Sequence, residues 1–367
     1  MKNKKFSSID NIINIAKKGD MYILVDDKNR ENEGDLVIPA LNASQKNINF
    51  MAKYGRGLIC LSLTSKQAKK LNLPLMSPVN KSRNQTAFTI SIEARKGVTT
   101  GISAKDRSIT IRTAIKPNVK KNEIVSPGHI FPIISKDGGV LVRAGHTEGS
   151  VDISRLANKN PSAVICEIMN DLGVMAKGKE LFNFAKKHKL KIGRIDDLIA
   201  HRLKVEKLIK FKKTDKILIK NQQYNIKIFE NLLDGSENFA LVKGNLIKSK
   251  NPRVRVISSN IVQNYLMGQK LPNSFNQTIE HFKHHKECAL IFIRDTNLKS
   301  VSQTLRDYKS NKFYKKDKDK LIKNYGIGAQ IIKALNIKNM ILVTRSKKKV
   351  VGLEGYGITI TKQEIIK

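Results

Sequence analysis

Short apolar runs alternate with helix-like patterns along the first half of the chain. Met21–Val25 is such a run, and it follows segment 8–19, whose apolar residues recur with helical spacing behind a serine cap. Further strand-like runs lie at 57–62, 86–92, 109–111 and 163–168, and further helical patterns at 66–71, 150–157 and 179–188. Because strands and helices bury their apolar sides against each other in layers, this half predicts an α/β (α+β) fold, a mixed β-sheet packed with helices.

The length of the chain calls for a second domain. A chain of 367 residues is longer than one ordinary hydrophobic core supports. Around 203–213 the chain turns strongly basic and polar, so we place a boundary there and divide the chain into 1–205 and 206–367. The second part carries strand-like runs at 216–219, 224–229, 289–293 and 340–344 and a helical pattern at 329–335, which predicts a second mixed sheet packed with helices.

The composition argues against several protein classes. No apolar run approaches the roughly 20 residues of a membrane span. The basic N-terminus lacks the continuous apolar core of an export signal. Cys60, Cys166 and Cys288 are widely separated without CxxC spacing, so neither a disulfide framework nor a local zinc knuckle is indicated. We therefore expect a cytoplasmic protein without membrane contact.

The net charge of +38 is the extreme feature of the composition. Such a surface ordinarily favours nucleic acids, because basic side chains displace counterions from phosphates. Here the lysines are scattered through both halves, aromatic residues are few, and no RNA-binding or zinc-finger signature appears. We expect a surface that attracts anionic metabolites and no specific nucleic-acid partner. A basic nucleic-acid-binding protein is the alternative from another class.

Three carboxylates cluster shortly after the first expected strand. Glu31, Glu33 and Asp35 alternate along five residues, and in an extended loop they would point to one side, as ligands of a hard cation or partners of sugar hydroxyls do. The alternative is a solvated acidic turn. That alternative is less expected in a chain with 69 basic and 31 acidic residues.

Two histidines and one further carboxylate are candidates for chemistry. His129 and His146 each follow a glycine, in 126–131 and 143–147, so both are expected on turns. An imidazole there suits metal binding or proton transfer near neutral pH, although a lone histidine is more often structural. Glu167 lies inside an apolar run, where burial raises the proton affinity of a carboxylate unless a cation compensates. Its alternative role is a partly buried carboxylate paired with a surface lysine.

Seven motifs follow one another along the first half of the chain, namely Val25–Leu36, Thr86–Thr89, Gly97–Ala104, Pro127–Phe131, Asp137–Leu141, Arg143–Glu148 and Val164–Asn170. In this order they resemble the motifs of the 3,4-dihydroxy-2-butanone 4-phosphate synthases of riboflavin biosynthesis. The ordered series, running across 6–203, is far more specific than any single motif. The resemblance implies a lyase, dependent on Mg²⁺ or Mn²⁺, that converts D-ribulose 5-phosphate to L-3,4-dihydroxybutan-2-one 4-phosphate and formate.

The resemblance also implies residue roles, by motif position. Glu31 and His146 would hold the metal ion, and His129 and Glu167 would be essential for proton transfer. Substrate contacts would come from Arg30, Glu31, Asp35, Arg143, Ala144, Gly145, His146, Thr147 and Glu167. Cys60 matches a position close to the family's site, although a role as a small buried apolar residue explains it equally well. Since the family's synthases are homodimers with sites at the subunit interface, a homodimer is implied.

Residues from about 208 onward resemble GTP cyclohydrolase II more weakly. The match is strongest at Asn324–Ile332 and Val350–Gly357. Where that family holds its catalytic zinc with three cysteines, this chain has Asn260, Leu271 and Asn273. The family's catalytic Asp-x-Arg reads Leu321-Ile-Lys323, and its GTP-contact segment is missing near 295–299.

These replacements predict a second domain that keeps its fold and has lost GTP hydrolysis. Without thiolates the expected tetrahedral site is gone, so no zinc is expected. His281, His284 and His285 are expected to be solvated on a lysine-rich helix. The alternative is a bifunctional enzyme with a reshaped second site.

Overall fold

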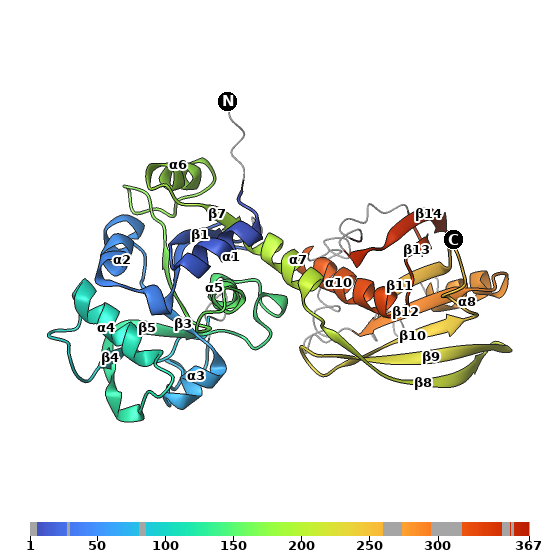
Figure 1. Ribbon diagram of the computed structural model, residues 1–367, viewed down its shortest axis with the longest axis horizontal. Helices are drawn as coiled ribbons and strands as arrows, with labels where there is room; N and C mark the ends of the chain where they lie inside the picture. Colours follow the sequence, from blue (N-terminus) through green and yellow to red (C-terminus); the bar gives the residue numbers. More distant parts are fainter. Residues whose placement is uncertain are drawn as a thin grey trace. The chain divides into compact units, whose positions relative to one another are not determined.

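The computed structural model describes residues 6–27, 30–80, 86–259, 274–294, 318–346, 353 and 356–366. Its contacts divide the chain into two compact units, Met1–His201 and Arg202–Lys367. Each unit is a mixed β-sheet packed with helices (Figure 1), so the predicted fold class is confirmed. Within the described residues, no helix is long and apolar enough to cross a membrane.

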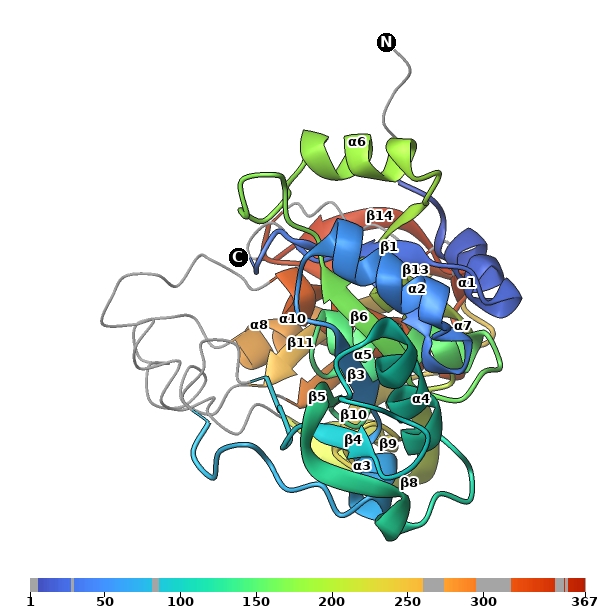
Figure 2. The same cartoon turned by 90° about the vertical axis from the view of Figure 1, so that its left-hand side faces the viewer.

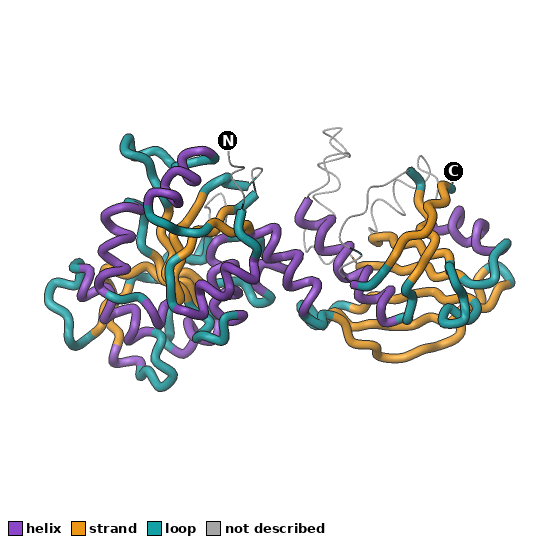
Figure 3. The backbone as a smooth tube through the Cα atoms, turned by 45° about the horizontal axis from the view of Figure 1, so that its top comes forward, coloured by secondary structure: helices purple, strands orange, loops and turns teal. Residues whose placement is uncertain are grey.

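The first unit has a seven-stranded sheet in the order β4-β5-β3-β6-β2-β1-β7. Strands β1 and β7, and strands β3 and β5, run parallel, while the other neighbours are antiparallel. Figure 3 shows the strands in the middle of the unit with helices around them. Their bounds are β1 Tyr22–Val25, β2 Gly34–Pro39, β3 Cys60–Leu63, β4 Ile92–Ala94, β5 Ile124–Ile134, β6 Ala163–Glu167 and β7 Ile192–Arg194.

The helices of this unit begin mostly at hydroxyl caps. Ser8, for instance, accepts a hydrogen bond from the amide of Asn11 at the start of α1, and Gly19 ends the helix with φ 85°. The helices are α1 Ile9–Lys18, α2 Gln45–Phe50, α3 Ser65–Lys70, α4 Ala104–Ala114, α5 His146–Leu156 and α6 Lys179–Lys187, with short helical turns at Ala40–Asn42, Met51–Gly55, Lys121–Glu123 and Gly139–Leu141.

Alternation along the strands gives the sheet two faces. On one face, apolar residues of β1, β2, β3 and β6 join a core with α2, α4 and α6; they include Ile23, Leu36, Leu61 and Cys166. The other face meets α5, which packs on the same four strands. Figure 2 shows α5 beside β3 and β6. Leu24, for example, lies against Gly149 of α5.

The α5 face carries the polar residues of interest. Asp35, Cys60 and Glu167 each stand next to a core residue in sequence, so their side chains point to the opposite face. Antiparallel pairing of β2 with β6 places Asp35 directly opposite Glu167. The sheet therefore aligns two carboxylates under the start of α5.

Several segments differ from the sequence prediction. Residues 109–111, expected to be a strand, lie inside α4, because Ser103 caps that helix and Asp106 stands in its first turn. Residues 126–131, expected to be a turn, belong to β5. His146 is the first residue of α5 and not part of a turn. Residues 86–91 make only isolated bridges before β4 begins.

The second unit has a seven-stranded sheet in the order β14-β13-β11-β12-β10-β9-β8. Strands β8, β9, β10 and β12 are antiparallel neighbours, while β12, β11, β13 and β14 run parallel. The strands are β8 Ile209–Ile219, β9 Gln222–Asn231, β10 Glu237–Lys243, β11 Arg253–Ser259, β12 Cys288–Arg294, β13 Asn339–Thr344 and β14 Thr359–Ile365, and the helices are α8 Ser274–Lys283 and α10 Lys318–Ala334.

Helix α7 (Ile195–Val205) crosses the boundary between the units. Its end is bonded into the second unit, because the Gln330 side chain donates to the carbonyls of Leu203 and Glu206 and accepts from the amide of Leu208. Arg202 makes a two-pronged ion pair with Glu206. The second unit thus begins at Arg202, ahead of the boundary at 205/206 that the composition suggests.

Some positions discussed above lie outside the described residues. They are Asn260, Leu271, Asn273 and 295–299, together with the side chains of Leu321 and Lys323.

Candidate metal and substrate site

The loop after β1 is organised by a buried carboxylate, Asp26. One of its oxygens accepts from the guanidinium of Arg30 at 2.8 Å and from the amide of Glu31 at 3.2 Å. The other accepts from the amide of Glu33 at 3.0 Å. Asp26 thereby fixes the backbone that carries the acidic cluster. Asp26 lies in the motif Val25–Leu36, and its place directly after a buried strand is the sequence signal for this role.

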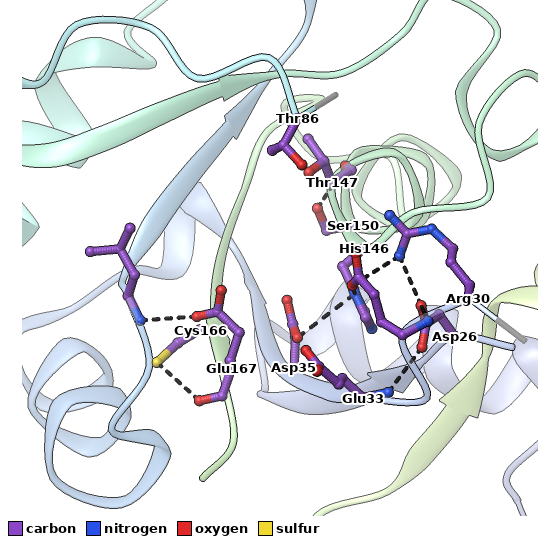
Figure 4. Close-up of polar contacts among 12 residues, drawn as sticks. Asp26, Arg30, Glu33, Asp35, Thr86, His146, Thr147, Ser150, Cys166 and Glu167 are labelled. Carbon is purple, nitrogen blue, oxygen red and sulfur yellow. Dashed lines mark hydrogen bonds and ion pairs between the residues drawn. The ribbon is translucent and has the colours of Figure 1, made fainter. Parts of the chain in front are cut away.

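Figure 4 shows His146 facing this loop. Its Nδ1 lies 3.8 Å from Glu31 Oε2 and 3.8 Å from Asp35 Oδ1. One ligand atom each of Asp26, Glu31 and His146 lies within 4.8 Å of the other two. Because the acidic loop follows β1 and His146 begins α5, the packing of α5 on the sheet brings the two segments together.

Two atoms of this cluster are buried without a hydrogen-bond partner among the described residues. They are Asp35 Oδ1 and His146 Nε2. Buried polar atoms are almost always paired, and leaving one unpaired costs about 1–3 kcal/mol. Such atoms side by side indicate a site built for a ligand that bonds them. The donor set of carboxylate oxygens and an imidazole fits Mg²⁺ or Mn²⁺.

Burial and neighbouring charges raise the pKa of two carboxylates in this group, while burial lowers the pKa of the imidazole. Burial raises the pKa of Asp35 well above its usual range, and the carboxylates of Glu167 and Glu31 raise it further. Burial, followed by the charge of Glu31, also raises the pKa of Glu33. Burial lowers the pKa of His146. A divalent cation would favour ionised carboxylates and a neutral imidazole, the states in which both are ligands.

The segment 143–147 leads directly into α5. The Arg143 guanidinium donates to Glu148 at 2.6 Å and to the hydroxyl of Thr86 at 3.3 Å. Glu148 also accepts from the amide of Lys136 at 3.0 Å, so it ties the arginine to a second loop. A Cβ at Gly145 would lie 2.5 Å from Arg143 Nη1, so a side chain there would displace the guanidinium. Glu148 is the last residue of the motif Arg143–Glu148, and these contacts give it a role that the motif alone does not indicate.

Glu167 and Cys60 lie on neighbouring strands of the same face. Glu167 accepts a hydrogen bond from the amide of Leu58 at 2.9 Å. Cys60 is 2% exposed, and burial, then the charge of Glu167, raises the pKa of its thiol well above the usual range. A protonated buried thiol beside Glu167 fits both readings of Cys60, a small apolar residue and one close to the site.

His129 belongs to a different group. Among the described residues, its side chain bonds only Glu93 of β4, with His129 Nδ1 2.7 Å from Glu93 Oε2. The structure therefore brings together Arg30, Glu31, Asp35 and His146, with Glu167 across from Asp35, and gives His129 a separate partner. Nothing in the sequence pattern pointed to Glu93.

A second group of possible ligands lies in the other unit. His281, His285 and Glu364 have ligand atoms within 4.8 Å of one another. However, Arg253 donates to both oxygens of Glu364 at 2.9 and 3.1 Å, and His281 lies 3.1 Å from the same carboxylate. The guanidinium already supplies the charge that a metal ion would bring, so this group is an ion-pair cluster. His281 and His285 are half-buried, not fully solvated as expected, while His284 is exposed.

The comparisons with known proteins agree with the two units. A family model described as 3,4-dihydroxy-2-butanone 4-phosphate synthase matches residues 10–201, and one described as GTP cyclohydrolase II matches 212–364. The riboflavin biosynthesis protein RibBA of Aquifex aeolicus is 39% identical over 378 residues, covering 99% of this chain and 93% of that protein.

Two solved structures are similar to this chain. The first is RibBX, a two-domain 3,4-dihydroxy-2-butanone 4-phosphate synthase from A. baumannii; its TM-score is 0.84 at 34% identity, over 98% of this chain and 99% of that one. The second is a 3,4-dihydroxy-2-butanone 4-phosphate synthase in complex with two magnesium ions; its TM-score is 0.52 at 38% identity, over 55% of this chain and 98% of that one.

Proposed function

The chain belongs to the 3,4-dihydroxy-2-butanone 4-phosphate synthase family, and on that premise we propose that it converts D-ribulose 5-phosphate to L-3,4-dihydroxybutan-2-one 4-phosphate and formate in riboflavin biosynthesis. The observation that carries this proposal is a pair of buried atoms, Asp35 Oδ1 and His146 Nε2, that accept or donate no hydrogen bond among the described residues and lie in one group of carboxylates. Most buried polar atoms of folded proteins are hydrogen-bonded, so two such atoms in one group of possible metal ligands favour a ligand site.

Glu31 and His146 hold a divalent ion, Mg²⁺ or Mn²⁺, in this proposal. The proximity of their ligand atoms and the Mg²⁺ complex of a similar synthase support it. When bound, the ion supplies positive charge that polarises the substrate's ketone. Asp26 is the less suitable ligand, because its oxygens already accept hydrogen bonds from Arg30 and from two loop amides.

The substrate contacts in this proposal are those that the family motifs imply. Arg30 and Asp35 border the metal cluster and bind the sugar, and the segment Arg143–Thr147, with Ala144 and Gly145 between, binds it from the start of α5. Arg143 is the phosphate partner, since a guanidinium oriented by Glu148 can present paired N–H groups to an anion. Glu167, opposite Asp35, also touches substrate and with His129 transfers protons.

Assembly and location belong to the proposal as well. The family resemblance implies a homodimer with its sites at the subunit interface. A cytoplasmic location is supported by three cysteines, Cys60, Cys166 and Cys288, that are all buried and unpaired.

A formate-release assay with ribulose 5-phosphate tests the synthase. We expect activity that requires Mg²⁺ or Mn²⁺ and disappears with chelator. Loss of an outer-shell partner of a metal ligand alone costs about 10–100-fold, so His146→Ala should lower kcat/KM by about 100-fold or more. His284→Ala, an exposed histidine of the second unit, is the matched control. Turnover that ignores chelator, or equal activity in both variants, would contradict the proposal.

For the second unit we propose a GTP cyclohydrolase II fold without that activity. The support is the sequence, in which Asn260, Leu271 and Asn273 replace the zinc-binding cysteines. Release of formate from GTP with added Zn²⁺, run on the same preparation, should be undetectable. Zinc-dependent release would establish the bifunctional alternative.

Salt-sensitive nucleic-acid binding without lyase activity would favour the alternative from another class, a basic nucleic-acid-binding protein.

A further inference from the structure

A polar pair on β4 and β5 lies apart from the metal cluster. Oε2 of Glu93 lies 2.7 Å from the ring Nδ1 of His129 and accepts a hydrogen bond from the backbone amide of His129 at 3.2 Å. The exposures of the two side chains differ, with 11% for Glu93 and 42% for His129. The carboxylate is thus fixed inside the protein while the ring reaches toward solvent.

Strand register explains why these two residues meet. Ile92 pairs with Ile130 while Glu93 pairs with Val125, so residues 126–129 interrupt the ladder at the position of Glu93. The Glu93 carboxylate lies beside His129 of this interruption. Gly128 makes the close approach possible, because a Cβ there would lie 2.1 Å from the backbone of Ile92. The glycine before the histidine, which in the sequence suggested a turn, serves this contact.

Glu93 is itself held in place from two sides. Its other oxygen accepts a hydrogen bond from the hydroxyl of Thr110 on α4 at 2.8 Å. That hydroxyl in turn accepts from the amide of Ala94 on β4 at 3.0 Å. Glu93 therefore cannot turn away from His129 without losing its hydrogen bond to Thr110 of α4.

The turn at 97–101 covers the hydrogen bond between the pair. Gly101 has φ 89°, and a Cβ on it would lie 2.1 Å from Glu93 Oε2 and 2.5 Å from His129 Nδ1. Asp106 fixes this turn by accepting from the hydroxyl of Thr99 at 2.7 Å and the amide of Gly101 at 3.1 Å. The glycine- and threonine-rich motif thus keeps bulk away from the Glu93–His129 contact.

The contact has a consequence for the imidazole tautomer. An ionised carboxylate only accepts hydrogen bonds, so the ring nitrogen facing it, Nδ1, carries the proton. The neutral ring then has Nε2 as its proton acceptor, and the same carboxylate stabilises the imidazolium formed when Nε2 takes a proton.

We propose that Glu93 is the positioning residue of the lyase reaction, holding His129 as the Nδ1–H tautomer with Nε2 presented for proton transfer. This inference rests on the proposed function, in which His129 transfers protons. Glu93 does not touch the reacting atoms; it acts through His129.

A double-mutant cycle on the full chain with saturating Mg²⁺ tests this role. Glu93→Ala should lower kcat by about 100-fold or more, with KM changed less than about threefold, because tautomer and orientation are lost while binding is kept. In a His129→Ala background, Glu93→Ala should cost less than about threefold. An equal loss in both backgrounds would show a purely structural role and overturn the proposal.

Two further measurements separate positioning from folding. Glu93→Gln keeps an acceptor for Nδ1 and should recover at least about tenfold of the activity lost in Glu93→Ala, while exposed Glu237→Ala should match the unmodified chain. Nitrogen-15 histidine NMR should show a protonated Nδ1 at His129 in the unmodified chain and in Glu93→Gln, and a mixture in Glu93→Ala. If lyase activity is absent altogether, the proposed function fails, and the NMR spectra still test whether Glu93 sets the tautomer of His129. If the His129 signals of Glu93→Ala equal those of the unmodified chain, Glu93 does not set the tautomer.

Discussion

Asp26 is a buried residue that organises the candidate site through its hydrogen bonds. Its carboxylate collects the amides of Glu31 and Glu33 and the guanidinium of Arg30, so the loop that presents Glu31 to His146 depends on it. Glu148 does the same for Arg143. In both cases a carboxylate bonded to backbone amides fixes the position of a neighbouring functional side chain.

Asp26→Asn should therefore weaken Mg²⁺ binding more than it lowers kcat at saturating Mg²⁺. An asparagine offers one acceptor oxygen where the carboxylate offers two, so at least one of the loop amides or the Arg30 contact is lost. We expect the Mg²⁺ concentration for half-maximal formate release to rise about 10–100-fold, with kcat at saturating Mg²⁺ changed less. Exposed Asp20→Asn is the control, and an unchanged Mg²⁺ requirement would remove Asp26 from the site.

At the scale of elements, local signals predicted much of the fold, and long-range contacts decided the rest. The capped helix α1 and the apolar strand β1 follow from patterns within a few residues. Helix α4 does not, because its polar residues Ser108 and Thr110 are buried and bonded to distant partners, Ala43 and Glu93. The sequence Ile109–Ile111 is typical of a strand, and the contacts that favour a helix here involve residues far away in the sequence.

The candidate site divides along the same line. The residues within one motif, such as Glu31 and Asp35, were predictable because the motif itself carries them. The pairing of His129 with Glu93 required the register of β4 on β5, with its shift at Ile92, and no local pattern contains a register shift.

Ser103 should be the main local determinant of α4. Its hydroxyl accepts from the amide of Asp106 at 3.0 Å, and loss of such a cap costs about 1 kcal/mol. Ser103→Ala should lower the free energy of unfolding by that amount in urea denaturation followed by circular dichroism. Ser103→Asn, which restores an acceptor, should recover most of it. Equal stability of both variants would mean that tertiary contacts alone fix the helix.

An ion-pair group ties α8 to the turn between β8 and β9. Glu280 bonds Lys220 and Lys283, each at 2.7 Å, and these bonds lower the pKa of Glu280 from 4.5 to about 2. Because the folded pKa lies below the unfolded value, the stabilisation is present above pH 4.5 and is lost as the pH falls toward 2.

Glu280→Gln should follow that pH dependence. The urea midpoint of the variant should lie below that of the unmodified chain at pH 7, and the gap should narrow steadily between pH 4.5 and 2. Exposed Glu237→Gln should show no such trend. If the difference in urea midpoint between Glu280→Gln and the unmodified chain stays constant with pH, the charge of Glu280 does not contribute to stability.

At the scale of the whole molecule, the two units have separate cores and the candidate metal cluster belongs to the first alone. A ligand that binds only a folded unit stabilises that unit, by about 2.7 kcal/mol at a concentration 100 times Kd. We therefore expect Mg²⁺ to raise the melting transition of the first unit in calorimetry and to leave that of the second unchanged. His146→Ala should abolish the shift; equal shifts of both transitions, or none, would contradict a metal site confined to the first unit.

Helix α7 determines where the chain can be divided when its two units are expressed as separate proteins. Its residues before 202 count with the first unit, while Arg202 and Leu203 are already bonded to Glu206 and Gln330 of the second. If the chain is divided after residue 205, the second fragment lacks Arg202, whose guanidinium pairs with Glu206. If it is divided before residue 195, the first fragment lacks the whole of α7. For separate expression the chain should therefore be divided between residues 201 and 202, the boundary of the two units.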